Sequence, residues 1–520
     1  MAYQGRQPGV GVRNRFIYSA TNGQTSFSGA DSNGLTLAYA DATYVDVFLN
    51  GVLLVPVSDY AATTKTSVVL GSGAAASDIV EIVAYEISSI ANAVPTSGGT
   101  FTGAVTVQGN FSADGGTIKL DGNYPNGVNN VALGNTALDT ASGSNGYSVA
   151  IGTNALTAMT SGGSNVAVGY ASAVAMTTGG NNVAVGTEAL DATTTGGSNV
   201  AIGSAALGSN TTASNNTAVG YDSLKDNTTG AQNTGIGMYA LANNTTASDN
   251  FAGGYNALGA NTTGSNNVGI GHRALQANTT ASNNTAVGHQ AGYANTTGAD
   301  NVAVGYLSLS TETGGQNNVA VGRSALENQV NSSGNIYNTA VGAKAGRAVT
   351  TGTRNTLIGG IAGDALTTGG DNTVLGYNAL TSDTLGSKSV AIGRSVLSSQ
   401  NFTSATDTYN TAVGYGAGGQ VTTGVQNTLI GGLAGDALTV GSTNVAIGVS
   451  SLGADTKGNS SVAIGSSALR LQNFTSATDV YNVAIGRAAG ENVTTGVQNT
   501  LIGGLAGDAM TTGSYNTAVG

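Results

Sequence analysis

Two histidines are the residues of this chain most suggestive of chemistry. His272 and His289 each directly follow the closing glycine of a phrase that recurs with a 17-residue period, so they are expected to stack in adjacent repeats. Histidine nitrogens are common zinc ligands, and three copies of this pair around an axis would offer a metal or anion site. A row of solvated surface side chains explains the same spacing without a ligand. With no cysteine and only two histidines, the sequence predicts no resident metal and no cofactor.

Six tyrosines share the position of these histidines in the repeat: Tyr170, Tyr221, Tyr255, Tyr306, Tyr377 and Tyr415. Such a ladder of aromatic rings is able to stack on cell-surface sugars, or simply to cover the edge of each repeat. A second column begins Asn-Thr-Thr at 17-residue steps: Asn210, Asn227, Asn244, Asn261, Asn278 and Asn295. These asparagines match the acceptor pattern for N-glycosylation, and we interpret them as turn residues.

Catalytic chemistry has little support in the sequence. The stretch from Gly414 to Gly419 fits the dinucleotide pattern G-x-G-x-x-G, but it lies in the repeat register with no long helix after it. A glycan-cleaving site needs two carboxylates beside the bond that is cut, and Asp plus Glu number only 27 in 520 residues. We therefore expect a protein that is not an enzyme.

Composition restricts the partners further. Charged residues are 8% of the chain and the formal net charge is −11, which argues against nucleic acid and anionic membrane surfaces. No run of apolar residues is long enough for membrane insertion. The first residues contain no apolar core of a signal peptide, so we expect the chain to be made in a cytoplasm.

The positions of these residues are set by a repeat that fills three quarters of the chain. The phrase Asn-Val-Ala-Ile-Gly, or Asn-Thr-Ala-Val-Gly, recurs from Gly134 to Gly520, and most of its closing glycines follow one another at 17-residue steps. Alternating β-branched and small residues predict a short strand, and the glycine predicts a turn. Copies stacked at about 4.8 Å would form a rod roughly 110 Å long. We predict a parallel β-roll or solenoid of about 23 repeats over residues 127–520, open at its C-terminal end.

Three longer repeats interrupt the regular spacing. They end at Gly342, Gly414 and Gly486, which are evenly spaced along the chain, and the sequence from Gln400 to Asp407 returns from Gln472 to Asp479. The longer loops are candidate contact surfaces, or alternatively spacers.

Within each repeat the Val/Ile columns and the Ala/Leu columns are both apolar. One set is expected to fill the coil and the other a seam between chains, and we predict that Val304, directly before a coil glycine, is buried.

The N-terminal part lacks the repeat. Short apolar runs from Arg15 to Ile87, with Asn50-Gly51 as a hairpin signal between two of them, predict a β-sandwich over residues 15–86. Residues 87–126 read as a linker with a short helix and a Gly/Thr-rich β segment. The expected fold class is therefore all-β throughout.

Two parts of the sequence resemble known families. The runs from Ile17 to Gly29, Tyr44 to Leu54 and Asp78 to Tyr85 resemble the N-terminal module of bacteriophage tail fibres, and the run from Ser97 to Val107 is similar to the linker repeat of those fibres. The Asn-Val-Ala-Ile-Gly coils resemble the head repeats of trimeric autotransporter adhesins. The period of 17 is longer than the adhesin unit, and neither a secretion signal nor a membrane anchor is found. These departures favour a virion fibre.

The resemblance implies an intertwined homotrimer in the virion tail. Its N-terminus would bind tail adaptor or nozzle proteins, and its distal part would bind a host receptor, either a glycan or an outer-membrane protein. Residues 1–14 would form a flexible tail-attachment segment, with Arg6, Arg13 and Arg15 docking to an acidic tail component. A bacterial trimeric surface adhesin and a polysaccharide-degrading tail spike remain as alternatives, and an ice-binding protein ranks last.

Overall fold

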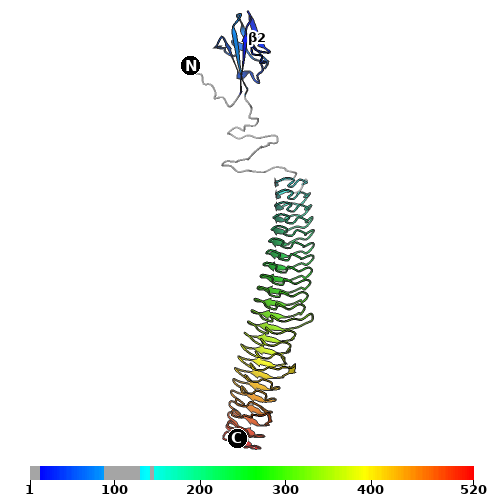
Figure 1. The fold of residues 1–520 in the computed structure, drawn as a ribbon, viewed down its shortest axis with the longest axis vertical. Helices are drawn as coiled ribbons and strands as arrows, with labels where there is room; N and C mark the ends of the chain where they lie inside the picture. The colour runs from blue at the N-terminus through cyan, green and yellow to red at the C-terminus, as the bar shows by residue number, and fades with distance from the viewer. Residues whose placement is uncertain (1–11, 87–128, 141–145) are drawn as a thin grey trace. The chain divides into compact units, whose positions relative to one another are not determined.

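The computed structural model describes residues 12–86, 129–140 and 146–520. The chain divides into two compact units, Met1–Ile118 and Lys119–Gly520 (Figure 1). The linker predicted over residues 87–126 and the candidate docking residue Arg6 lie outside the described residues.

The N-terminal unit consists of two antiparallel sheets that enclose one core. The first sheet has the strand order β1-β7-β3-β4 and the second has the order β2-β6-β5. Phe16 of the first sheet and Phe27 and Val68 of the second belong to one buried cluster, which confirms the predicted sandwich. The elements are β1 Val12–Ser19, β2 Gln24–Ser28, η1 Ala42–Tyr44, β3 Val45–Leu49, β4 Val52–Leu53, β5 Tyr60–Ala61, β6 Ser67–Ala74 and β7 Ile79–Glu86.

The Asn50-Gly51 hairpin forms as predicted. Both residues have positive φ, 51° and 83°, and Leu49 pairs with Val52 across the turn. Strand β2 was not predicted because only Phe27 of its five residues is apolar and buried. Among the apolar runs from which the sandwich is predicted, the run at residues 37–40 does not form a strand.

The second unit is a parallel β-solenoid, drawn in Figure 1 as a stack of similar coils from cyan to red. Each strand of its main ladder pairs in parallel with the strand of the next coil, so that Val166 lies beside Val183. The ladder contains 23 strands in the described residues, and four shorter strands form two extra pairs. The ladder strands are β8 Val131–Leu133, β9 Val149–Ile151, β10 Val166–Val168, β11 Val183–Val185, β12 Val200–Ile202, β13 Thr217–Val219, β14 Thr234–Ile236, β15 Phe251–Gly253, β16 Val268–Ile270, β17 Thr285–Val287, β18 Val302–Val304, β19 Val319–Val321, β20 Thr339–Val341, β21 Thr356–Ile358, β22 Thr373–Leu375, β24 Val390–Ile392, β26 Thr411–Val413, β27 Thr428–Ile430, β28 Val445–Ile447, β30 Val462–Ile464, β32 Val483–Ile485, β33 Thr500–Ile502 and β34 Thr517–Val519. The extra strands are β23 Gly386–Ser387, β25 Thr406–Asp407, β29 Gly458–Asn459 and β31 Thr478–Asp479.

A coil glycine follows each ladder strand, and the positions of other residues are counted from it. At Gly305 φ is 133°, a conformation that L side chains rarely adopt, and a Cβ added there would lie 2.6 Å from the carbonyl oxygen of Gly322. Close approach of successive coils therefore requires glycine at this position.

The interior of the coil holds small and branched side chains from three positions. Ala252 at position −2, and Ala257 and Leu258 at positions +3 and +4, are fully buried, and the same columns run along the whole stack. The Val/Ile column at position −1 is not in this interior: Val304 is half-exposed and Ile270 is 40% exposed. The prediction that Val304 is buried is wrong, because the strand alternates and position −2 points inward.

Buried asparagines at position −4 hold neighbouring coils together. The Asn182 side-chain oxygen accepts a hydrogen bond from the backbone N–H of Asn199 at 2.9 Å, and the Asn182 amide nitrogen donates to the Gly196 carbonyl oxygen at 3.0 Å. Both backbone groups are inside the coil, where an unpaired polar group would cost free energy. This explains why asparagine recurs at position −4.

In some coils the large interior residue lies at position −2 and the small one at position +4, the reverse of the usual order. In the coil of Gly431, position −2 is Leu429 instead of alanine and position +4 is Gly435 instead of leucine. A Cβ at Gly435 would lie 2.8 Å from a methyl carbon of Leu429 and 2.9 Å from one of Leu438, so these two leucines occupy the space that the missing side chain leaves. The coils of Gly359 and Gly503 show the same exchange.

Candidate binding surfaces

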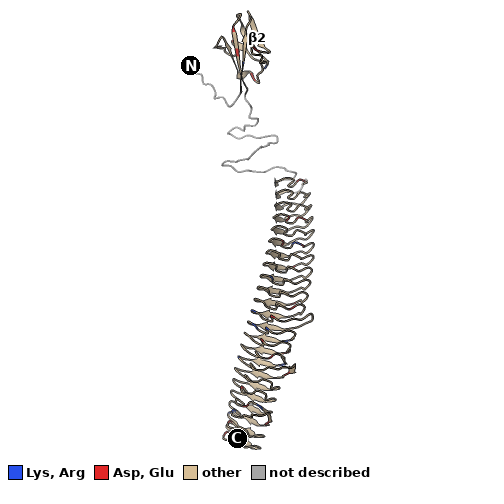
Figure 2. Cartoon of the chain, in the orientation of Figure 1, with Lys and Arg blue, Asp and Glu red and all other residues tan. Residues whose placement is uncertain are grey.

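The outward face of the ladder is a surface that continues from coil to coil along the solenoid. It is built from positions −3 and −1, which hold Val or Thr and Val, Ile or Leu in nearly every described coil and no charged residue. Ile202, Ile236 and Ile270 are 40 to 44% exposed. We call this the outer strand face. Figure 2 shows that the coil stack carries few charged residues. Few charges would therefore have to be desolvated if the outer strand face packed against an apolar partner.

The predicted aromatic ladder forms over part of its length. The rings of Tyr221, Tyr239, Tyr255, His272, His289 and Tyr306 follow one another with centroid separations of 4.9 to 6.2 Å. From Tyr255 to Tyr306 the rings are stacked face to face, so neighbouring rings cover the faces that a sugar would use. Tyr239 lies at position +2 rather than +1, and sequence reasoning therefore missed it.

The remaining predicted tyrosines stand apart from this stack. Tyr170, Tyr377 and Tyr415 are 54, 56 and 58% exposed. The guanidinium of Arg394 lies 5.7 Å from the ring centroid of Tyr415, as a cation–π contact. These three residues are surface side chains with no further ring contact among the described residues.

The histidine pair comes together, but in a geometry unsuited to chelation. The imidazoles of His272 and His289 are 4.9 Å apart and parallel to within 4°. A ligand nitrogen points its lone pair within its own ring plane, and two parallel planes never meet at one ion. The described residues also contain no group of three or more His, Cys, Asp or Glu side chains placed to hold a metal.

The asparagines of the Asn-Thr-Thr column are interior residues, not exposed turn residues. Asn227, Asn244 and Asn261 are fully buried, and each side-chain nitrogen donates to the side-chain oxygen one coil earlier, at 3.1, 2.8 and 2.9 Å. The column lies at position +7, beside the column at position −4, because Asn227 and Asn216 both donate to the Gly230 carbonyl oxygen at 2.9 Å. A buried amide is not accessible to a glycosylating enzyme.

The same interior column anchors the three longer loops. Asp383 is fully buried at position +7, and its carboxylate accepts hydrogen bonds from the Gln400 side chain at 2.6 Å and the Phe402 backbone at 3.3 Å. The Gln400 oxygen in turn accepts from the Asn410 amide at 2.9 Å. Equivalent sets are Asp455, Gln472 and Asn482, and Glu312, Gln329 and Asn338.

Each anchored loop presents a tyrosine beside an acid or an amide. Tyr337, Tyr409 and Tyr481 lie at position −5 and are 53, 53 and 54% exposed. Asn335, Asp407 and Asp479 precede them by two residues and are also exposed, while the residue between each pair is buried. We call these three pairs the loop rims. The sequence left the loops open as contact surfaces or spacers and did not single out these tyrosines, because their shared register appears only after the insertions are aligned.

The arginines proposed for docking differ in their contacts. Arg15 lies within β1 and forms an ion pair with Glu81 of the neighbouring strand β7, with Nε 2.5 Å from the carboxylate, which holds the pKa of Glu81 below its usual range. Arg13 is exposed on the same strand.

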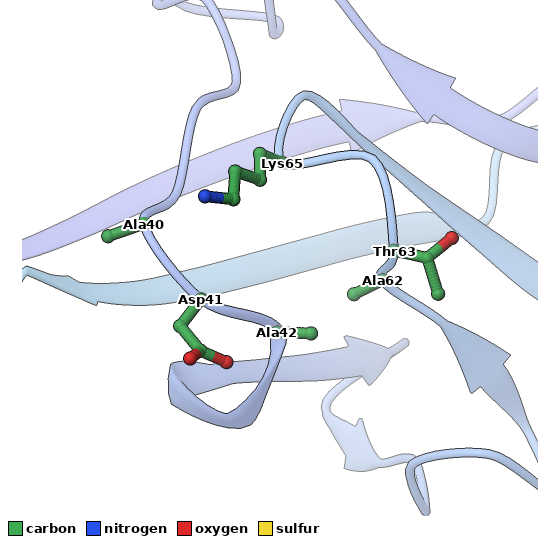
Figure 3. A pocket seen from close by; sticks show the side chains of 6 residues that line it. All are labelled: Ala40, Asp41, Ala42, Ala62, Thr63 and Lys65. Atoms are coloured by element: carbon green, nitrogen blue, oxygen red, sulfur yellow. The ribbon is translucent and has the colours of Figure 1, made fainter.

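A shallow pocket of the N-terminal unit is lined by Ala40, Asp41, Ala42, Ala62, Thr63 and Lys65 (Figure 3).

No family model matches the chain, and no curated protein or solved structure is significantly similar to it. No helix among the described residues has the length and apolar character needed to cross a bilayer. The fold defines the class: an all-β protein with a small antiparallel sandwich followed by a long parallel β-solenoid of 17-residue turns.

Proposed function

We propose that the chain is a structural fibre protein whose solenoid is the shaft of a homotrimer and which has no catalytic activity. The sandwich would attach the fibre to a phage tail through adaptor or nozzle proteins, and distal parts of the fibre would meet a receptor on the host cell. The observation that carries this proposal is the outer strand face, because it consists almost entirely of aliphatic and threonine side chains, is uncharged and continues over the whole ladder.

A second copy of the chain is the partner best matched to this face. A surface that repeats once per coil stays in register only with a partner of the same axial repeat. At about 4.8 Å per coil the face is roughly 110 Å long, well beyond what a stable interface requires. The β-branched columns of valine, threonine and isoleucine resemble the residues of a sheet face that packs against another layer, and not those of a solvent-exposed face.

Sedimentation of the purified chain tests the shaft. The face variant Val287→Asp, Val304→Asp, Val321→Asp places three charges on adjacent half-exposed positions. The control Thr263→Asp, Thr280→Asp, Thr297→Asp places the same charges, at the same spacing, on an exposed column away from the strands. We expect the wild type and the control to be trimers and the face variant to be a monomer with unchanged circular dichroism. A monomeric wild type, or a trimeric face variant, would contradict the proposal.

Attachment to a tail requires a separate experiment. An antibody against residues 12–86 should label the tail end of thin fibres in electron images of virions. Label on a bacterial surface, with none on virions, would favour the alternative of a surface adhesin, which shares the shaft but not the site of attachment.

A further inference from the structure

The loop rims combine an aromatic ring with a hydrogen-bonding group in the same arrangement three times. At the second rim the Lys388 ammonium lies 2.6 Å from the Asp407 carboxylate, 3.2 Å from the Tyr409 hydroxyl and 5.2 Å from the centre of the tyrosine ring. At the third rim Asn459 donates to Asp479 at 3.2 Å, and at the first Asn317 donates to Asn335 at 2.9 Å. Each rim therefore offers an exposed ring beside a polar group fixed by the preceding coil.

Tyrosine is an unusual residue for the backbone at this position. Position −5 has positive φ throughout the stack, and nine of the twenty regular coils place asparagine or aspartate there, such as Asn266 and Asp300, which tolerate it best. Tyr337, Tyr409 and Tyr481 have φ of 57°, 52° and 53°. Tyr147 and Tyr515 hold the same position in coils without a long loop, so the ring alone does not distinguish the longer loops. What the three longer loops share is the exposed ring together with a polar residue two places earlier that bonds to the preceding coil.

Duplication alone does not explain the recurrence. The second and third loops share their sequence, but the first is one residue shorter and differs in most positions. It nevertheless retains the tyrosine, the polar residue two places earlier and a buried carboxylate–glutamine anchor, with Glu312 in place of aspartate. The anchor holds each rim before any ligand arrives, and such preorganisation lowers the entropic cost of binding.

We propose that the loop rims bind a neutral glycan chain lying along the solenoid. The tyrosine ring would stack on the apolar face of a sugar, and the aspartate or asparagine would hydrogen-bond to its hydroxyls. Asp479, on a chain of net charge −11, disfavours an anionic polysaccharide, whereas the charge of Asp407 is balanced by Lys388. A protein partner fits less well, because each rim is far smaller than the roughly 800 Å² per partner of a stable protein interface.

The spacing of the rims suits a polymer. The rims recur every four coils, which is about 19 Å along the axis. Each exposed rim alone would bind weakly, whereas one flexible glycan that spans two or three rims gains affinity by multivalency. This inference adds a ligand to the proposed shaft and holds whether the shaft is a monomer or a trimer.

A glycan array with matched variants tests the proposal. The rim variant is Tyr337→Asn, Tyr409→Asn, Tyr481→Asn, which installs a residue that regular coils carry at position −5. The control is Tyr170→Ser, Tyr377→Ser, Tyr415→Ser, which removes three tyrosines of similar exposure and installs a residue found at position +1 in other coils. Labelled full-length proteins are applied to printed neutral and anionic oligosaccharides of two to twelve sugars, and each variant is also sedimented.

We expect the wild type and the control to bind neutral oligosaccharides, with at least tenfold tighter binding once the chain exceeds the distance between rims. The rim variant should lose at least tenfold in affinity and keep the wild-type sedimentation. The proposal is overturned if the wild type binds no neutral oligosaccharide, or if the rim variant binds as well as the control. It is also overturned if the rim variant changes its oligomeric state, since the rims would then be contacts between chains. Sedimentation of the wild type reports trimerisation independently of the glycan array. A failure of the shaft proposal is therefore distinguished from a failure of the glycan proposal.

Discussion

At Gly305 the fold depends on one missing side chain. The residue combines positive φ with a backbone oxygen of the next coil at 2.6 Å from where a Cβ would be. We expect Gly305→Ala to cost about 3 kcal/mol or more, from backbone strain and overpacking together. Gly432→Ala is the control, because a Cβ there meets nothing within 4 Å. Thermal unfolding should show a lower midpoint for Gly305→Ala only, and equal midpoints would refute the close-approach argument.

The buried carboxylate of Asp31 contributes to the acid sensitivity of the sandwich. Asp31 is buried and accepts hydrogen bonds from the backbone N–H groups of Ile17, Leu35 and Asn33 at 2.8 to 2.9 Å, which hold its pKa below the usual value. A depressed pKa stabilises the fold above the unfolded value of about 3.9, and this contribution disappears as the pH falls through the folded pKa.

Asp31→Asn should therefore lower the stability of the N-terminal unit at pH 7 and reduce the further loss between pH 5 and pH 3. The slope should not vanish, because the pKa values of Asp41, Asp59, Asp78 and Glu81 are also lowered by hydrogen bonds. Calorimetry of the full chain at several pH values measures this. A wild-type slope in the variant would show that Asp31 does not contribute to the pH dependence of stability.

Within a coil, stability depends on matched sizes rather than on any one residue. Leu429→Ala should cost about 2 to 5 kcal/mol by leaving a cavity, and Gly435→Leu should overpack against Leu429. The double variant places alanine and leucine as at Ala252 and Leu258, where leucine also has a φ near 52°, and it relieves the contact with Leu429 while the contact with Leu438 remains. We expect it to be more stable than the sum of the single effects by at least about 1 kcal/mol. Additive free energies of unfolding would contradict this size exchange.

The coil also shows what the sequence could predict. Period, strand and glycine turn follow from local residue types, so the solenoid and the stacking of His272 on His289 were predictable. The sequence could not predict which apolar column points into the coil, because Ala and Val at alternate positions suit either face of a strand. The choice between the two faces depends on the volume that the whole coil encloses. The burial of Asn227 was missed for a related reason, since Asn-Thr-Thr is typical of an exposed turn. Whether the outer strand face meets another chain stays a prediction.

At the scale of the molecule, the solenoid is a sum of neighbouring coils, so removing a whole number of them should preserve it. The segment 415–486 is one four-coil block of the duplicated sequence. Its deletion joins Gly414 to Arg487, and Ala489, Gly490 and Val493 then replace Ala417, Gly418 and Val421 in the same interior positions.

We expect the deletion to give a folded rod shorter by about 19 Å in electron images, with thermal stability close to that of the full chain. The control deletes only 415–478, which brings the next coil in out of phase and sets polar loop residues in the interior columns. That protein should aggregate or lose its ordered C-terminal coils, because every column beyond the junction is displaced. If both deletions folded equally well, register between coils would not be what stabilises the stack, and the buried asparagine and alanine columns would have to be reinterpreted as consequences of composition alone.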